Sequence, residues 1–350
     1  MAFLSVVTTV RATSQEDFRY GVYKSNGTAY IEKYIGSSAV VDVPSSIRAD
    51  SGDRDDDGNP IYRNYTVTCI SKYAFSGNVG ITQVSIPETI TDGSKLCIFA
   101  ECTNLREVNF KGVVRDIPTG MFSKCSNLQT LDLQWDSIES IGSGAFQDCG
   151  YDFGVLDYLP NVKTIGARAF GNVQTLTSVS LSSLTRIERE AFIGCGNLES
   201  ASVDGAGLRL EGGGENDYYT YGPFARCPKL RTVRLGDGVV SIPYRLFYGS
   251  TNLETVVLGR GITVANTVLR DLKNLTTVVA RGAIRVIPTG MFSGCSNLRT
   301  LDLKWDSVES IGSGAFQDCG YDFGELDYLP NVKTIGARAF GNVQTLTSVS

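Results

Sequence analysis

Cysteines and carboxylates are the side chains that could carry chemistry in this 350-residue sequence, because it contains no histidine. Histidine is the commonest general base and metal ligand in proteins. A nucleophilic cysteine needs a base beside it, and a zinc site needs paired spacings such as C-x-x-C, which do not occur among the nine cysteines. The residue types therefore exclude most hydrolase templates and predict a protein with no cofactor and no enzymatic activity.

One carboxylate chemistry stays compatible with the composition. Glycoside hydrolysis uses two facing carboxylates and needs no histidine. Four aspartates could supply such a pair: Asp132, Asp157, Asp302 and Asp327. Nothing in their spacing singles out two of them, so a glycoside-active enzyme is the least favoured alternative.

An acidic stretch near the N-terminus matches the opening of a calcium-binding loop. Asp53, Asp55 and Asp57 alternate and are followed by a glycine, as oxygen ligands around a calcium ion do. The twelfth position is Asn64, where a bidentate Glu is expected. Because the flanking residues predict strands, we favour a solvated acidic hairpin loop over a calcium site.

A long internal duplication points to architecture and binding before chemistry. Residues 117–180 and 287–350 differ only at Lys124/Gly294, Gln129/Arg299, Gln134/Lys304, Ile138/Val308 and Val155/Glu325. A catalytic site brings unlike groups together once, whereas a duplicated segment presents the same surface twice.

A shorter repeat lies inside the duplication. An apolar residue, usually phenylalanine, recurs as the anchor of the motif I-x-x-x-A-F-x-x-C-x-x-L-x-x-V-x-L. The anchors are Phe75, Phe99, Phe122, Phe146, Phe170, Phe192, Phe224, Phe247, Leu269, Phe292, Phe316 and Phe340. A period in this range with an L-x-x-V-x-L signature predicts a leucine-rich solenoid, in which each coil buries its apolar face against its neighbours.

Each repeat predicts one strand followed by a compact bend. Segments such as LREVNF from Leu105 and LTSVSL from Leu176 are short and rich in β-branched residues. The I-G-x-x-A-F-x-x-C runs that follow place apolar groups at spacings that one helical turn or a tight bend would point inward. We therefore expect an α/β repeat fold, a curved solenoid of about twelve repeats of 22–24 residues.

The motif resembles the BspA-type leucine-rich repeat of bacterial and protist surface proteins, over about residues 70 to 350. The stretch DFRYGVYKSNGTAYIEKYIGSSAVVDVPSSI looks like the β-hairpin cap that precedes such arrays. The resemblance implies a secreted or surface-attached adhesin or binding protein, at the cell surface or extracellular, and it supplies no catalytic residues. This copy departs from the pattern at Leu269, where the phenylalanine is lost.

Seven of the cysteines occupy one repeat position, three residues after the anchor. They are Cys102, Cys125, Cys149, Cys195, Cys227, Cys295 and Cys319. Other repeats place Val173, Ser250 or Leu272 at that position, so it accepts small or apolar groups. Stacked coils leave parallel side chains badly aimed for a disulfide. We therefore predict buried free thiols, with Cys97 and Cys102 as the one pair to check.

The candidate binding residues lie on the predicted strand face and after two strands. Arg231 and Arg234 occupy outward positions of L-x-x-V-x-L, where a solvated polar face is the plainer interpretation. Trp135 and Trp305 are the only tryptophans and follow a strand in each copy of the duplication. Exposed, they would be equivalent binding anchors; packing against the edge of the solenoid is the alternative.

A third candidate surface is the one long interval, the 32 residues from Phe192 to Phe224. The extra residues form a predicted insertion loop at 210–222 that contains three consecutive glycines, Gly212 to Gly214, and the tyrosines Tyr218, Tyr219 and Tyr221. Tyrosine-rich loops are common in recognition surfaces. The alternative is that the rings fold back to plug a gap in the array.

Charge and hydropathy limit the partners. The formal net charge of -5 and the lack of a basic cluster argue against nucleic acid, and no apolar run reaches the length of a membrane span. We expect residues 1–14 to be a signal remnant or flexible end, 15–69 a β-hairpin cap and 70–350 the solenoid, with further repeats or an anchoring domain beyond Ser350. The predicted function is binding of a protein or glycan, with a structural spacer as the alternative.

Overall fold

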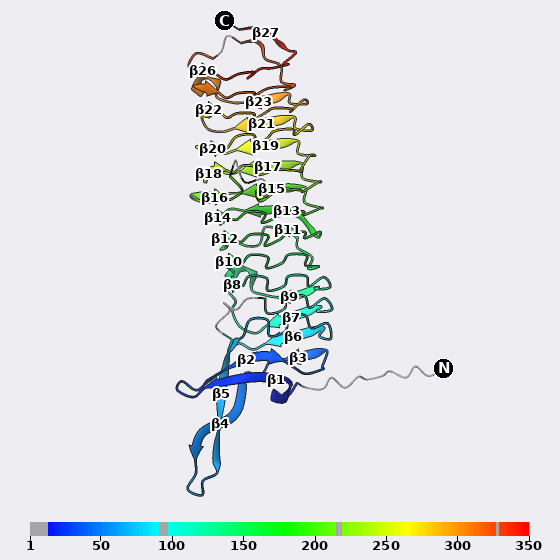
Figure 1. Ribbon diagram of the computed structural model, residues 1–350, viewed down its shortest axis with the longest axis vertical. Coiled ribbons are helices and arrows are strands. Elements are labelled where there is room, and N and C mark those ends of the chain that lie inside the picture. The colour runs from blue at the N-terminus through cyan, green and yellow to red at the C-terminus, as the bar shows by residue number, and fades with distance from the viewer. Residues whose placement is uncertain (1–12, 91–96, 215–216, 218, 327–328, 350) are drawn as a thin grey trace, which may run out of the picture. The chain divides into compact units, whose positions relative to one another are not determined.

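The computed structural model describes residues 13–90, 97–214, 217, 219–326 and 329–349 (Figure 1). The chain divides into two compact units, Met1–Ser137 with Cys149–Tyr151 and Ile138–Asp148 with Asp152–Ser350. Within the described ranges the regular structure is β-strand and short 3-10 helix, with no α-helix.

The first unit begins with a four-stranded sheet in the order β1-β2-β5-β4. Its elements are the 3-10 helix η1 (Gln15–Asp17) and the strands β1 (Phe18–Tyr23), β2 (Thr28–Tyr34), β4 (Ser46–Arg54) and β5 (Pro60–Ile70). β1 and β2 are antiparallel, as are β4 and β5, and β2 runs parallel to β5. Ile31, Ile47 and Val67 are fully buried, because alternate side chains of a strand point to one face.

A parallel sheet in the order β3-β6-β7-β9 completes the first unit. Its elements are β3 (Val40–Asp42), β6 (Gln83–Ile86), β7 (Glu107–Phe110) and β9 (Thr130–Asp132), beside β8 (Asp116–Ile117) and η2 (Trp135–Ser137). Val41, Val84 and Val108 pair in register and are fully buried. β3 therefore starts the sheet that the repeats extend.

Stacked coils with parallel strands on two sides form the second unit (Figure 1). One sheet has the order β11-β13-β15-β17-β19-β21-β23. Its strands are β11 (Gly154–Leu156), β13 (Leu176–Leu181), β15 (Ser200–Val203), β17 (Thr232–Leu235), β19 (Thr255–Leu258), β21 (Thr277–Ala280) and β23 (Thr300–Asp302). Val179, Ala201 and Val233 pair in register and are buried.

Shorter strands line the other side of the second unit. They are β10 (Ser140–Ile141), β12 (Thr164–Ile165), β14 (Arg186–Ile187), β16 (Leu208–Leu210), β18 (Val239–Ile242), β20 (Thr263–Val264), β22 (Val286–Ile287), β24 (Ser310–Ile311) and β26 (Thr334–Ile335). β25 (Gly324–Leu326) pairs with β27 (Leu346–Val349), and η3 (Trp305–Ser307) follows β23. The longest of these side strands, β16 and β18, flank the insertion.

The repeat phenylalanines form a continuous stack in the core. The ring centroids of Phe146, Phe170, Phe192 and Phe224 are separated by 5.6, 5.3 and 5.3 Å in sequence order, and the rings are nearly parallel. All four side chains are fully buried, and Leu269 takes the same buried place in its coil. The predicted leucine-rich solenoid is confirmed.

The bends around the anchors are tight turns, where the expected α/β class allowed a helical turn. Residues two positions before and after an anchor adopt the left-handed conformation, as Arg168 (φ 54°) and Asn172 (φ 58°) do around Phe170. A left-handed residue ends a right-handed helix, so none extends through the bend. Several coils place glycine at these positions, for example Gly194 and Gly249.

The cysteine position is a buried hydrogen-bonding slot. The Cys102 thiol donates to the carbonyl oxygen of Phe75 in the preceding coil at 3.0 Å, and Ser250 Oγ donates in the same way to Phe224 at 2.7 Å. All nine cysteines are free, and the seven repeat cysteines are buried, as predicted. Burial raises the pKa of Cys102 and of Cys227 to about 12. These thiols are neutral and enclosed at physiological pH.

Candidate functional site

The strand face is exposed, and its two candidate arginines differ in their partners. Arg231 forms an ion pair with Glu254 of the next coil. Arg234 lies in β17 between Ser202 and Val257 of the neighbouring strands, and across the described ranges its side chain has no ion pair. Arg234 is therefore the more available of the two for a ligand.

The two tryptophans are partly buried and pack against aromatic neighbours. The Trp135 ring lies 5.9 Å from that of Tyr151. The Trp305 ring lies 6.1 Å from Phe316 and 6.2 Å from Phe323. Packing against the solenoid, the plainer of the two interpretations, describes both side chains, although part of each ring stays accessible.

One part of the insertion loop projects into solvent, and another part packs against the solenoid. Tyr219 is 89% exposed, whereas Tyr221 is partly buried and its ring stacks on Tyr248 at 4.9 Å. Tyr218 lies outside the described residues. Asp217 shapes the loop by accepting the backbone N–H groups of Tyr219 and Thr220, each at 3.1 Å. Tyr219 therefore fits the interpretation of the loop as a recognition surface, and Tyr221 fits the interpretation in which the rings fold back onto the array.

A buried carboxylate fastens the loop to the solenoid. Only 5% of the Glu190 side chain is exposed, and Glu190 forms an ion pair with Arg168 of the preceding coil. Its other oxygen accepts the backbone N–H of Tyr221 at 3.3 Å. Because removing one partner of a buried charged group leaves the other unsatisfied, Glu190 holds the end of the loop in place.

A cluster of tyrosines and arginines surrounds this attachment. We call Tyr221, Arg226, Tyr244, Arg245 and Tyr248 the tyrosine–arginine cluster. The Arg226 guanidinium lies 4.7 Å from the Tyr221 ring centroid, and Arg226 Nη2 donates to the Tyr221 hydroxyl at 3.1 Å. The Arg245 guanidinium lies 5.3 Å from the rings of both Tyr244 and Tyr248. Cation–π contacts therefore arrange cations and rings together at the surface.

Two hollows adjoin the loop and the cluster. Tyr219 and Thr220 line a hollow of about 580 Å³ together with Arg168 and Glu190. A second hollow, of about 380 Å³, is lined by Tyr244, Arg245 and Tyr248 of the cluster and by residues of the next coil. Residues of the insertion line the first of these hollows and not the second.

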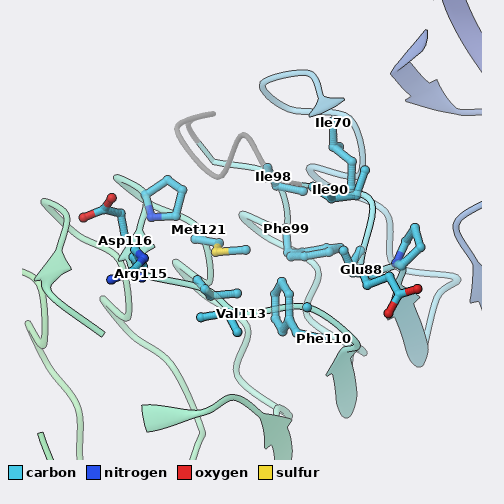
Figure 2. A pocket seen from close by; sticks show the side chains of 15 residues that line it. Ile70, Glu88, Ile90, Ile98, Phe99, Phe110, Val113, Arg115, Asp116 and Met121 are labelled. Atoms are coloured by element: carbon cyan, nitrogen blue, oxygen red, sulfur yellow. The ribbon is translucent and has the colours of Figure 1, made fainter. Parts of the chain in front are cut away.

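A third hollow, in the first unit, is apolar. It has a volume of about 510 Å³, and Figure 2 shows Phe99, Phe110 and Met121 near its centre. Glu88 lies toward one end and Arg115 toward the other (Figure 2). Small-molecule sites have similar volumes and linings.

The second unit has another hollow of about 510 Å³. Val113 of the first hollow corresponds to Ala283 of the second, and Thr263, Asn266 and Thr289 add polar groups to the second. Most residues that line the two hollows lie outside the duplicated segments 117–180 and 287–350, so the duplication does not account for them. The first hollow differs from the second mainly in its larger number of apolar side chains.

The acidic stretch forms the expected hairpin loop between β4 and β5. Asp53 pairs with Arg63 at 2.8 Å, and the Asp55 carboxylate accepts the backbone N–H groups of Asp57 and Asn59. The backbone N–H of Asn59 contributes most to lowering the pKa of Asp55. In the part of the chain that the structure describes, no group of three or more Asp, Glu, Cys or His side chains could hold a metal ion.

The aspartates considered for glycoside chemistry do not line the hollows described above. Asp132, Asp157 and Asp302 are exposed, and Asp327 lies outside the described residues. No helix in the described ranges is long and apolar enough to cross a membrane.

Sequence inspection missed four members of the tyrosine–arginine cluster. Arg226 follows the anchor Phe224 by two residues, and Arg245 precedes the anchor Phe247 by two. Aligning these outward bend positions across the repeats would have brought the arginines together, with Tyr248 beside them. The candidate binding residues were chosen largely from strand positions, so the residues in the bends were not considered.

The stacked coils, with their phenylalanine core and parallel strands, define a leucine-rich-repeat solenoid. A family model described as BspA type leucine rich repeat region (6 copies) matches residues 59–157, 153–208 and 220–349. The chain belongs to this family. No curated protein matches it.

A solved structure supports the fold, and a second shows a weaker likeness. A leucine-rich repeat protein from Bacteroides ovatus aligns with a TM-score of 0.57 and 21% identity, covering 95% of this chain and 89% of that chain. A leucine rich cell surface protein from Faecalibacterium prausnitzii aligns with a TM-score of 0.34 and 20% identity, covering 84% and 94% of the two chains.

Proposed function

We propose that this chain is a non-enzymatic binding protein or adhesin, secreted or displayed at the cell surface, that recognises a protein or glycan. The tyrosine–arginine cluster beside the insertion loop is the observation that carries the proposal. A loop that served only as a linker would not need stacked rings, paired cations and a buried carboxylate to fasten it. Tyrosine and arginine are the residue types that dominate binding interfaces.

The proposal gives the surface two parts. The loop supplies Tyr219, which projects into solvent with 89% of its surface exposed, and the cluster supplies a preorganised platform beneath it. The strand face is a second, weaker candidate through Arg234. Preorganisation favours binding, because fewer side chains lose freedom when the ligand arrives.

Membership of the BspA-type family supports the surface location and the binding role, and the repeated sequence argues against a unique catalytic site. The alternative of a structural spacer predicts that the exposed loop residues have no effect on any interaction. We further propose that residues 15–69 act as the N-terminal cap of the array, since β3 begins the sheet that the repeats continue.

The test is an array of glycans and proteins probed with the purified chain and with Tyr219→Ser. Tyr62→Ser is the matched control, because Tyr62 is also a largely exposed tyrosine, 54% accessible, on the β5 hairpin. We expect Tyr219→Ser to weaken binding at the features that the wild-type chain selects by about tenfold, and Tyr62→Ser to leave them unchanged. Equal binding by all three proteins would place recognition away from Tyr219, and no binding by any of them would support the spacer.

A further inference from the structure

The residues that line the apolar hollow of the first unit differ in exposure (Figure 2). Ile98, Phe99 and Met121 are buried, with at most 5% of each residue exposed. Phe110 is half-buried, and Val113 is 58% exposed. Apolar side chains that stay accessible inside a concave surface release water when a ligand covers them, and this release favours binding. The hollow therefore offers accessible surface to an occupant with an apolar body.

Phe110 gives the hollow more apolar surface than the fold requires. It is the last residue of β7, and the equivalent last residues of β17 and β19 are Leu235 and Leu258. Both leucines are fully buried, whereas part of the larger Phe110 ring stays accessible. Because leucine satisfies the coil at this position, packing of the array does not explain the phenylalanine.

Glu88, at one end of the hollow, carries a charge that its neighbours leave unneutralised. A Cβ atom at Gly112 would lie 3.1 Å from the Cα atom of Glu88. In the second unit, a Cβ atom at Gly282 would lie 2.8 Å from the Cα atom of Arg260, so Glu88 and Arg260 hold equivalent positions. Arg260 pairs with Asp237 of the preceding coil at 3.7 Å. Glu88 is exposed and, among the residues that the structure describes, has no ion pair.

The charges at the other end of the hollow balance each other. Arg115 and Asp116 lie together there, away from Glu88 (Figure 2). The charged side chains that line the hollow therefore leave one negative formal charge, at the Glu88 end. The volume of about 510 Å³ falls within the range of small-molecule sites. An apolar body with a single cationic group complements this combination of shape, lining and charge.

We propose that the apolar hollow of the first unit binds a small organic amine, with its apolar ring against Phe99, Phe110 and Met121 and its ammonium group against Glu88. This site is separate from the tyrosine–arginine cluster, and it takes a small molecule in place of a protein or glycan. A neutral apolar molecule would cover the same lining but leave the Glu88 carboxylate unused. An acidic molecule would be repelled by Glu88 at one end and by Asp116 at the other.

The test compares three probes that share an indole ring and differ in charge. Tryptamine carries an ammonium group, tryptophol has a hydroxyl group in its place, and indole-3-acetate has a carboxylate. Each is titrated against the full chain at neutral pH, and ligand-observed NMR measures the dissociation constant. We expect tryptamine to bind severalfold more tightly than tryptophol, and indole-3-acetate to bind most weakly. Added salt should reduce the advantage of tryptamine, because it screens an exposed charge.

Matched variants locate the site. Glu88→Gln should weaken tryptamine to the level of tryptophol and leave tryptophol unchanged, because it removes only the charge. Phe110→Leu should weaken both ligands severalfold, because it removes apolar contact and places in β7 the residue that ends β17 and β19. Glu32→Gln is the control: Glu32 is an exposed glutamate of β2 that does not line the hollow, and its replacement should change neither affinity.

Absence of tryptamine binding would overturn the inference, as would equal affinities of tryptamine and tryptophol for the wild-type chain. Equal effects of Glu88→Gln and Glu32→Gln would show that the carboxylate of the hollow is not the partner of the amine. Unchanged affinities in Phe110→Leu would place the ligand outside the hollow. The array experiment with Tyr219→Ser concerns a residue of the second unit, so the proposed function stands or falls independently of these results.

Discussion

The bend at Arg168 and the bend at Arg226 share one backbone conformation and differ in what lies beside the cation. Arg168 (φ 54°) pairs with the buried Glu190, whereas Arg226 (φ 56°) lies over the Tyr221 ring. The scaffold therefore does not decide whether a charge is neutralised; the residue at the equivalent position of the adjacent coil does. In a solenoid, function can arise where the match between neighbouring coils fails.

The comparison also shows that left-handed backbone is no mark of function here. Positive φ occurs at paired positions such as Glu101 (φ 64°) and Lys124 (φ 60°) as well as in the cluster. The conformation recurs because the bend requires it in each coil. The chemistry of a bend thus depends on its side chains alone.

The largest effect on stability is expected from removing a phenylalanine of the buried stack that lies beneath both the Arg168 bend and the Arg226 bend. Phe192 stacks between Phe170 and Phe224 and is fully buried, so Phe192→Ala should lower the free energy of unfolding by about 3–5 kcal/mol. Denaturant unfolding measures the change. Tyr219→Ser is the control and should stay within about 0.5 kcal/mol of the wild type. A loss below about 1 kcal/mol in Phe192→Ala would contradict a continuous phenylalanine core.

The second effect removes the neutralising partner from one bend. Glu190→Ala should lower the free energy of unfolding by about 2–3 kcal/mol, because it leaves Arg168 and the Tyr221 N–H without their acceptor. Glu254→Ala breaks the Arg231 pair, whose glutamate side chain is 43% exposed, and should cost less than about 1 kcal/mol. Equal costs in the two variants would show that Glu190 does not hold the loop.

The third effect concerns the thiols behind the bends. Cys102 and Cys227 have pKa values of about 12 in the folded chain, above their ordinary value of about 9. Between these values the unfolded chain binds fewer protons than the folded one, so stability falls as pH rises. At pH 10 the loss should be about 1 kcal/mol per thiol.

Serine provides the matched replacement, because Ser250 occupies the same slot and makes the same hydrogen bond. The melting temperature of the variant with Cys102→Ser and Cys227→Ser should therefore fall less between pH 7 and pH 10 than that of the wild type. Parallel melting curves across this pH range would contradict the burial of the two thiols.

The smallest effect sharpens the contrast between the arginines. Arg226→Gln loses one cation–π contact at a largely exposed site, so the free energy of unfolding should fall by about 0.5–1 kcal/mol at most. The same variant is expected to lose much of its ligand affinity. A stability loss several times larger would place Arg226 in the architecture and not in recognition.

The sequence predicted the solenoid well, because the period of the anchors and the L-x-x-V-x-L segments reflect burial that each coil must repeat. It predicted the thiols for the same reason: Val173, Ser250 and Leu272 show that their position tolerates small or apolar groups. The absence of α-helix from the described bends was harder to foresee, since a helical turn and a tight bend place apolar residues alike.

The site was predicted only in part. The length and composition of the insertion predicted the loop. Only the structure shows that Tyr219 is exposed while Tyr221 packs against Tyr248. Tyr248 escaped notice because its ring stacks on Tyr221 of the preceding coil, a contact that inspection of single repeats does not show. Arg226 contacts Tyr221 within its own coil and was missed because only the strand positions were considered. Trp135 and Trp305 drew attention by residue type, yet their rings pack against aromatic neighbours.

The most direct test of the account is arginine modification by phenylglyoxal, read residue by residue by mass spectrometry, with and without a saturating ligand selected on the array of glycans and proteins. The account predicts that Arg226 reacts in the free protein and becomes protected when that ligand binds. Arg234 on the strand face should react equally in both samples. Protection of Arg234 with no change at Arg226 would place recognition on the strand face and contradict the account.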